Sequence, residues 1–370
     1  MNDSSGDTAR DISMKGAGYY SKATTGAKDV IDRGTPMILD AIAAMDFPDD
    51  GSRITMADMG CADGGTSIGM VRAALEAIRA RWPSRPIQMV YTDLPRNDFS
   101  QVFRIVHGQT EIETYVDDID NLYVFASATS FHKNMFPPGT LHLGFSATAS
   151  HYISEKPGVI SDHVHMVGAE GDERAAYEEQ GRRDWESFLS NRCAELAPGG
   201  RLALFNFGID EEGRYLGHTG GVSMFDTFNE IWAEFRDAGT ITEAEYLETN
   251  FPQCYRTVEQ FTAPLTDTGS KVYQAGLRLD HVETRVVRCP YEQDFTENHK
   301  DADKFAREYI PTLRSWSEMA FASGLSPDRP VDQRVEILDR YFQAYEDRVR
   351  SAPEGHAMDY VHIYLVLRKE

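Results

Sequence analysis

Apolar residues change their spacing several times along the first half of the chain, and each change predicts a new element. Residues 53–59 form a short apolar, β-prone run that leads into a glycine-rich turn, whereas residues 66–81 place apolar side chains three or four positions apart. The second spacing is typical of an amphipathic helix. Another apolar run, residues 87–91, follows two prolines. The pattern predicts a right-handed βαβ unit with parallel strands.

The same alternation continues through the middle of the chain. Residues 140–145 are predicted to form a strand, and residues 177–196 have a helical pattern. The Pro-Gly-Gly sequence at 198–200 is expected to end this helix and turn the chain. Residues 202–207 are apolar on both faces, as in a central strand of a covered sheet. With a late strand expected at 360–367, the pattern predicts a doubly wound α/β core.

Two stretches, residues 223–247 and 295–349, have helical spacing without strands between the helices. They predict an α-helical cap over one edge of the sheet. The expected units are an α/β core of residues 1–212, 253–290 and 356–370, and a cap of residues 213–252 and 291–355.

Composition excludes several classes of protein. The chain has 370 residues, with 59 acidic and 37 basic side chains and a net charge of −22, which disfavours nucleic acid as a partner. No apolar run approaches the ~18 residues of a membrane span, and the polar start is unlike a secretory signal. We therefore expect a cytoplasmic protein. The four cysteines lie 35 or more residues apart, which favours reduced, buried thiols.

The turn after the first strand indicates the ligand. Its spacing is G-x-x-x-G-G at residues 60–65, not the G-x-G-x-x-G of dinucleotide sites. Glycines such as Gly60 still permit close backbone approach, and the following helix N-terminus can receive a carboxylate. Asp93 ends the second strand, from which a carboxylate can bind both hydroxyls of a ribose. As an alternative, Asp58 or Asp63 simply caps the helix.

The glycine turn, the acidic end of the second strand and the later L-x-P-G-G-R-L-x-L sequence resemble class I S-adenosylmethionine-dependent methyltransferases. More narrowly, the chain is similar to the plant-type carboxyl methyltransferases of the salicylic acid, benzoic acid and theobromine synthase (SABATH) family. The matching segments are 20–24 (Y-x-x-N-S in the family), 56–61 (I-A-D-L-G-C), 93–99 (D-L-P-x-N-D-F), 130–137 (S-F-Y-x-R-L-F-P), 150–154 (L-H-W-L-S) and 250–255 (N-I-P-Q-Y).

This resemblance implies a Rossmann-like core with a mostly parallel seven-stranded sheet, helices on both faces and a helical cap. It implies S-adenosyl-L-methionine as cofactor, S-adenosyl-L-homocysteine as product, and a homodimer. Ser130 and Phe131 would lie near the adenine. The cofactor-binding residues expected from the motifs and the glycine turn are Tyr20, Thr24, Asp58, Gly60, Asp63, Asp93, Leu94, Ser130 and Phe131.

The acceptor positions depart from the family pattern. Where the family has a Gln and a Trp that donate to the substrate carboxylate, this chain has Ala27 and Tyr152. The Tyr152 hydroxyl can still donate, and His151 is the second expected donor, so both are predicted catalytic and substrate-binding residues. As an alternative, Tyr152 is an ordinary partly buried aromatic. A carboxylic acid is already ionised at neutral pH, so transfer to it needs alignment and desolvation but no general base.

Apolar residues of the cap would form the walls of the acceptor site, although a stripe at helical spacing is more often plain core. The wall residues expected are Met224, Phe225, Phe228, Trp232 and Phe321. His163 and His165 would share one strand face, but no third metal ligand is apparent and Leu247 replaces an acidic residue that some family members have near a magnesium ion. We expect no metal.

The sequence thus predicts an O-methyltransferase that forms methyl esters of small hydrophobic carboxylic acids, either benzoate- or salicylate-type aromatic acids or medium-chain fatty acids. An N-methyltransferase of the same family, acting on xanthine-like rings, is one alternative. Because the acceptor positions are altered, a ligand-binding protein without turnover is another. The glycine spacing places a dinucleotide-dependent reductase third.

Overall fold

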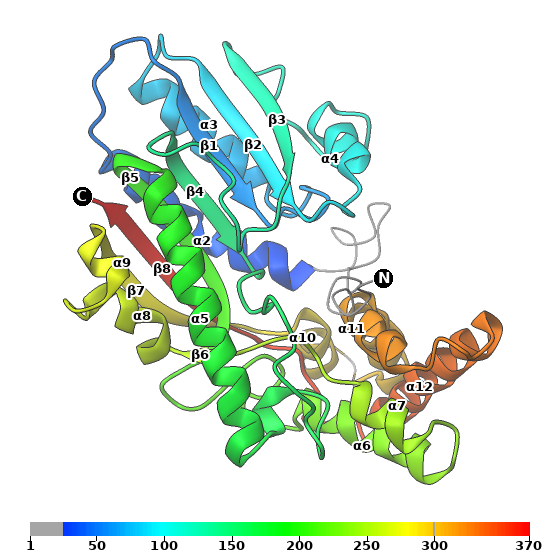
Figure 1. Ribbon diagram of the computed structural model, residues 1–370. Helices are drawn as coiled ribbons and strands as arrows, with labels where there is room; N and C mark the ends of the chain where they lie inside the picture. Colours follow the sequence, from blue (N-terminus) through cyan, green and yellow to red (C-terminus); the bar gives the residue numbers. More distant parts are fainter. Residues whose placement is uncertain (1–24, 299) are drawn as a thin grey trace.

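The computed structural model describes residues 25–298 and 300–370. One twisted sheet occupies the upper left of Figure 1, with strand order β3-β2-β1-β4-β5-β8-β7. Neighbours from β3 to β5 are parallel, and β8 is antiparallel to both β5 and β7. A two-residue strand, β6 (Arg256–Thr257), pairs with β5. The seven strands are β1 (Ile54–Met59), β2 (Ile87–Asp93), β3 (Leu122–Ala128), β4 (Leu141–Ala147), β5 (Leu196–Ile209), β7 (Leu277–Val287) and β8 (Tyr360–Lys369).

Helices cover both faces of this sheet. On one face, α2 contacts α3, β5 and β8. On the other face, α5 packs with α8 and α9. Every residue of β1 and β4 is buried, as expected for central strands of a sheet that is covered on both faces. The bounds are α2 (Thr25–Ala43), α3 (Ile68–Arg81), α4 (Phe99–Val106), α5 (Gly171–Glu195), α8 (Val258–Thr266) and α9 (Lys271–Gln274). The mostly parallel α/β fold is confirmed.

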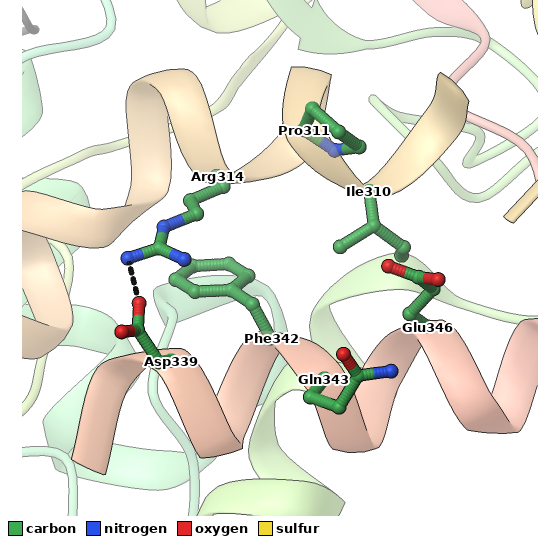
Figure 2. A pocket seen from close by; sticks show the side chains of 7 residues that line it. All are labelled: Ile310, Pro311, Arg314, Asp339, Phe342, Gln343 and Glu346. Atoms are coloured by element: carbon green, nitrogen blue, oxygen red, sulfur yellow. Dashed lines mark hydrogen bonds and ion pairs between the residues drawn. The ribbon is translucent and has the colours of Figure 1, made fainter. Parts of the chain in front are cut away.

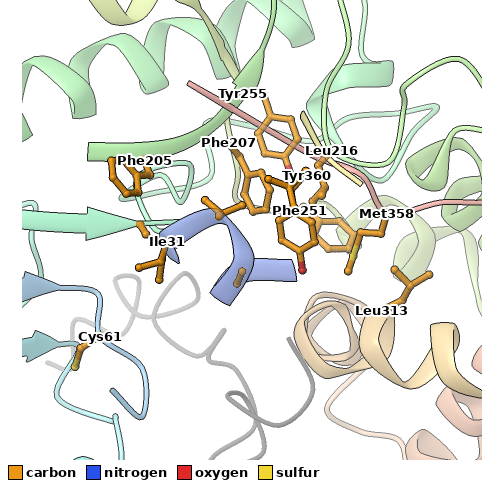
Figure 3. Packing of buried hydrophobic residues seen from close by; sticks show 14 of the residues in the cluster. Ile31, Cys61, Phe205, Phe207, Leu216, Phe251, Tyr255, Leu313, Met358 and Tyr360 are labelled. Carbon is orange, nitrogen blue, oxygen red and sulfur yellow. The ribbon is translucent and has the colours of Figure 1, made fainter. Parts of the chain in front are cut away.

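The remaining helices form a group at the lower right of Figure 1. They are α6 (Met224–Asp237), α7 (Glu243–Glu248), α10 (Pro290–Glu297), α11 (Ala302–Gly324) and α12 (Val331–Ser351). Thr242 begins α7 with a capping box to Glu245, and Glu245 also pairs with Arg329 before α12. That arginine holds the pKa of Glu245 at about 2. One cluster of buried apolar side chains runs from α2 and the sheet into these helices (Figure 3).

Some elements differ from the sequence prediction. β5 starts at Leu196, directly after α5, so the Pro-Gly-Gly sequence lies inside the strand. Gly199 has φ +83° there, and the register against β4 shifts at this level; glycine accommodates such a bulge. β3, β7 and α2 have no counterpart among the expected elements. None of the described helices is both long and apolar enough to cross a membrane. All four cysteines are free and buried, as predicted.

Candidate active site

A glycine loop, residues 60–67, follows β1 at the C-terminal edge of the sheet. Gly60 (φ +82°) and Ala62 (φ +50°) are left-handed, a conformation that glycine adopts freely and alanine rarely. A Cβ atom at Gly60 would lie 2.7 Å from the Cβ of Ala149. The amides of Gly60 and Cys61 both donate to the carbonyl of Thr92, at 2.8 and 3.1 Å. These bonds tie the loop to the end of β2.

Asp93 ends β2 beside the glycine loop. Its Oδ2 accepts the amide of Ala62 at 2.8 Å, and its Oδ1 accepts the amide of Leu94 at 2.7 Å. Asn97 donates to the Ala62 carbonyl at 2.7 Å. Burial raises the pKa of Asp93, while these amides and Arg96 oppose the shift. Because each carboxylate oxygen can accept more than one hydrogen bond, Asp93 can still bind a pair of hydroxyls.

Asp58, near the end of β1, is a second buried carboxylate. Its Oδ2 accepts the hydroxyl of Ser67 at 2.5 Å, just before α3 begins. Burial raises the pKa of Asp58 to about 7; the Ser67 hydrogen bond opposes this shift and the charge of Asp93 adds to it. Asp63 accepts the amide of Gly65 at 3.1 Å within the loop. Three carboxylates, those of Asp58, Asp63 and Asp93, therefore lie at one edge of the sheet.

Ser130 and Phe131 follow β3 at the same edge, since Ala128 pairs with Asp93 in the sheet. A buried ion pair between Arg192 and Glu195 (2.7 Å) supports this segment. Arg192 donates to the carbonyl of Phe131 at 2.8 Å. The segment that follows β3 thus has a fixed path, anchored to α5 by Arg192.

A small pocket, here called the aromatic pocket, lies beyond the ends of β4 and β5. Thr148, with φ +53°, follows β4 and donates its amide to the carbonyl of Phe205 at 2.8 Å. Side chains from the end of β5, the segment before β8 and the 250s region gather there (Figure 3). The pocket is lined by Thr148, His151, Tyr152, Phe207, Leu216, Gln253, Tyr255, Trp316, Met358 and Tyr360.

Two paired segments supply most of the polar groups of the aromatic pocket. Tyr152 and Gln253 form an antiparallel bridge, and the amide of Cys254 donates to the carbonyl of His151 at 2.8 Å. Burial and nearby Arg256 lower the pKa of His151 to about 3. His151 is therefore neutral at physiological pH and can take part in hydrogen bonds without carrying a charge.

A family model described as SAM dependent carboxyl methyltransferase matches residues 10–370. The chain belongs to this family. Its Asp93, glycine loop and aromatic pocket therefore lie in a SABATH methyltransferase that uses S-adenosyl-L-methionine and acts on carboxylic acids. The residues at this edge fit that cofactor. Asp93 can accept further hydrogen bonds from hydroxyl groups, and a loop that contains Gly60 lets a ligand approach the backbone closely.

Known proteins show how far this similarity extends. Gibberellic acid methyltransferase 2 of Arabidopsis thaliana is 23% identical, over 86% of this chain and 83% of that protein. Salicylate carboxymethyltransferase of Clarkia breweri is 27% identical, over 76% of this chain and 78% of that protein. A solved structure of loganic acid methyltransferase with SAH superposes with a TM-score of 0.75 at 20% identity, covering 97% of this chain and 99% of that chain. The structural match supports the class I methyltransferase fold.

The methyltransferase structure brings together most of the residues that the sequence singled out on the cofactor side. Tyr20 and Thr24 lie outside the described residues. The predicted positions after β1, β2 and β3 all lie along one sheet edge, as parallel neighbours require. Leu94 is 36% exposed at that edge. These positions are Asp58, Gly60, Asp63, Asp93, Leu94, Ser130 and Phe131. Their contact with the cofactor stays a prediction.

On the acceptor side, His151 and Tyr152 both line the aromatic pocket. The five predicted wall residues do not line it and are fully buried in α6 and α11. They are Met224, Phe225, Phe228, Trp232 and Phe321. They form a layer behind the pocket wall, where Phe225 lies 5.9 Å from Tyr255 between ring centroids. The wall itself includes Trp316 of α11, a residue that helical periodicity alone did not single out.

The two histidines considered for metal binding are not on a strand. His163 faces Asp226, with 3.3 Å between Nε2 and Oδ1, and His165 begins a short 3-10 helix at Met166–Gly168. The ring of His165 lies 3.2 Å from the side-chain oxygen of Gln253, measured from Nε2 to Oε1, so the two histidines have separate partners. Within residues 25–298 and 300–370, no group of three or more His, Cys, Asp or Glu side chains could hold a metal ion.

A larger open hollow lies between α11 and α12 (Figure 2). It is lined by Ile310, Pro311, Arg314, Asp339, Phe342, Gln343 and Glu346. Arg314 pairs with Asp339 at 2.6 Å and with Glu318 at 2.7 Å. Because this arginine is neutralised and the hollow shares no residue with the glycine loop or the aromatic pocket, we assign it no part in catalysis.

Proposed function

We propose that the enzyme esterifies a small hydrophobic carboxylic acid bound in the aromatic pocket, with His151 and Tyr152 donating hydrogen bonds to the carboxylate. The observation that carries this proposal is the pocket itself, which combines these polar groups with the rings of Phe207, Trp316 and Tyr360. Apolar walls favour a hydrophobic acid, and a few placed donors fix its orientation.

A buried cation supports an anionic acceptor. Arg256 is 2% exposed and donates to the carbonyls of Ser150 and Gly181, at 3.0 and 2.6 Å. Its charge lowers the pKa of neighbouring His151, so its potential extends to the pocket. A positive potential in a site shielded from water stabilises a bound carboxylate.

On the cofactor side, we propose that Asp93 binds the ribose hydroxyls and that Ser130 and Phe131 lie against the adenine. Asp58, Asp63 and the glycine loop would hold the amino-acid end. When bound, S-adenosyl-L-methionine supplies an electrophilic methyl group on a sulfonium.

The protein's catalytic contribution is then mainly positional. A carboxylate needs no base to become nucleophilic at neutral pH, so His151 and Tyr152 orient it and compensate for its lost water. Alignment of two bound reactants contributes up to about 7–11 kcal/mol to lowering a barrier. The buried, neutral state of His151 agrees with a donor that does not need to take up a proton.

Flat aromatic acids of the benzoate or salicylate type are the first candidates. Rings line the aromatic pocket on several sides, and ring faces and edges pack well against a planar acceptor. Medium-chain fatty acids are the second candidates, because Leu216 and Met358 add aliphatic surface to the same pocket.

A mass-spectrometric screen with methyl-deuterated S-adenosyl-L-methionine tests the proposal. The panel contains benzoates, salicylate, indole-3-acetate, linear C6–C14 fatty acids and xanthines. We expect a labelled methyl ester of at least one acid. Label only on a ring nitrogen would replace the carboxylate assignment with the N-methyltransferase, and cofactor binding without any labelled product would favour a binding protein.

We also propose that the enzyme is cytoplasmic, as expected from the sequence, and that it is a homodimer, as the family resemblance implies. Analytical ultracentrifugation of the purified chain should give twice 41.6 kDa. A single species at the monomer mass would contradict the dimer.

A further inference from the structure

The aromatic pocket contains more hydrogen-bonding groups than one carboxylate requires. Besides His151 and Tyr152, the side chains of Gln253 and Tyr255 reach it, and they are 2% and 1% exposed. Buried polar groups are normally paired, so an unpaired one indicates a missing partner.

The amide orientation of Gln253 follows from its neighbour. His165 Nδ1 accepts the amide of Val167 at 3.2 Å, so its proton lies on Nε2. This Nε2 lies 3.2 Å from Gln253 Oε1 and donates to it. Burial lowers the pKa of His165 well below its usual value, which keeps this neutral tautomer. The amide oxygen of Gln253 is thereby occupied, and its NH2 group is left to donate to the pocket.

Tyr255 supplies the second group. Its hydroxyl is buried and has no hydrogen-bond partner within the described part of the chain. Its ring is fixed between His165 (4.8 Å between centroids) and Phe207 (5.9 Å). A hydroxyl held in this way cannot turn to solvent, so a bound molecule is its natural partner.

We propose that Gln253 and Tyr255 form a second polar subsite, which binds a hydroxyl or carbonyl oxygen on the body of the acceptor. This inference rests on the proposed function, and it narrows the substrate class to oxygenated acids, meaning hydroxy or oxo acids. A plain hydrocarbon acid would leave the buried Tyr255 hydroxyl unpaired and would offer no acceptor to the Gln253 NH2 group. Sites built to hydrogen-bond a substrate strongly reject analogues that lack the group.

Matched pairs of acids test the subsite. Wild-type enzyme is assayed with benzoate against its three monohydroxy isomers, and with cyclohexanecarboxylate against its 4-oxo and 4-hydroxy forms. We expect at least one oxygenated acid to exceed its parent by about tenfold or more in kcat/KM. Equal kcat/KM across every pair would overturn the inference while leaving carboxyl methylation intact. No ester from any acid would instead count against the proposed function.

Variants then locate the preference. Tyr255→Phe and Gln253→Met should lower kcat/KM for the preferred oxygenated acid about tenfold more than for the parent acid, so that the ratio of the two kcat/KM values falls towards one. Tyr309→Phe is the matched control, because it removes another buried hydroxyl from the cap, outside the pocket. A preference that persists in both pocket variants would contradict the assignment.

His165 is a positioning residue in this scheme. His165→Leu should reduce the ratio of kcat/KM between the paired acids, and His165→Asn, whose amide can also donate, should restore part of it. A purely structural role would lower both rates together and leave the ratio unchanged, which would remove His165 from the subsite.

Discussion

The glycine loop and the aromatic pocket lie at the same end of the sheet but are assembled differently. The glycine loop and Asp93 come from two consecutive strand ends, and backbone hydrogen bonds join them directly. The aromatic pocket draws on residues from 148 to 360. Backbone hydrogen bonds join some of its segments, but its walls are completed by side chains that come from distant parts of the chain. A site made from local turns is specified by short motifs, whereas a site made from packed rings can change acceptor by single substitutions.

The largest expected effect is on cofactor binding at the site formed by the glycine loop and Asp93. Asp93→Ala removes the acceptor for the Ala62 and Leu94 amides and for the proposed ribose hydroxyls. Hydrogen bonds to charged groups contribute about 1.5–3 kcal/mol each, so we expect at least a hundredfold weaker cofactor binding by calorimetry and a similar loss of ester formation. Asp98→Ala is the control, because it removes a nearby carboxylate whose contact in the described part of the chain is the cap of α4. Unchanged cofactor affinity in Asp93→Ala would remove Asp93 from the site.

The two sites should also differ in how their buried titratable groups make the free energy of unfolding depend on pH. The pKa of Asp58 is raised to about 7, so the folded chain binds this proton more tightly than the unfolded chain. The stabilisation it gives is complete below about pH 4 and is lost as pH rises through 7, a change of about 4 kcal/mol. Urea unfolding from pH 5 to 8 should show Asp58→Asn gaining stability relative to wild type as pH rises.

His151→Asn provides the contrast in the aromatic pocket. Because burial holds the pKa of His151 at about 3, this variant should differ from wild type by a constant amount over the same pH range. A constant difference for Asp58→Asn as well would show that Asp58 is ionised throughout.

Local backbone geometry gives a smaller effect. Gly60→Ala combines a positive φ with a Cβ only 2.7 Å from Ala149, whereas Gly51→Ala has a similar φ (+76°) and no atom within 4 Å of the added carbon. Gly51→Ala should cost about 1–2 kcal/mol of unfolding free energy from the left-handed backbone alone. Gly60→Ala should cost about 1–3 kcal/mol more, from overpacking. Equal losses in urea unfolding would mean that the loop moves freely away from Ala149.

The same contrast explains what could be predicted from sequence. β1, β2 and β5 are apolar runs bounded by glycine or proline, and the turns after β1 and β2 carry the cofactor motifs, so local pattern was sufficient. The sequence pattern does not predict the edge strands β3 and β7. Residues of β3 alternate between partly buried and exposed, with Tyr123 54% exposed, and most residues of β7 are only partly buried or exposed. The alternation of apolar residues and the amino-acid composition are weak signals for a strand that has only one neighbouring strand.

The residues that line the pocket walls could not be predicted from the local sequence pattern for a different reason. Phe225, Phe228 and Trp232 have perfect helical spacing, but spacing shows only that one face of α6 is buried. Which side chain reaches the pocket depends on how α11 docks, and that places Trp316 at the wall instead. Such choices are made by tertiary packing, which periodicity does not encode.

The smallest expected effect comes from a substitution in the aromatic pocket, where the acid is proposed to bind. Tyr152→Phe removes one proposed carboxylate donor and should lower kcat/KM for the acid about tenfold, with cofactor affinity unchanged. Tyr152→Trp keeps an N–H donor at this position and should retain more activity, with a changed ranking of acids because the ring is larger. Tyr177→Phe, which removes a hydroxyl bonded to Gly158 away from the pocket, controls for general loss of a buried hydroxyl. If Tyr152→Phe weakens cofactor binding as much as it slows esterification, the two sites are not separate. The contrast between the glycine loop and the aromatic pocket would then be wrong, because Tyr152 should affect the pocket alone.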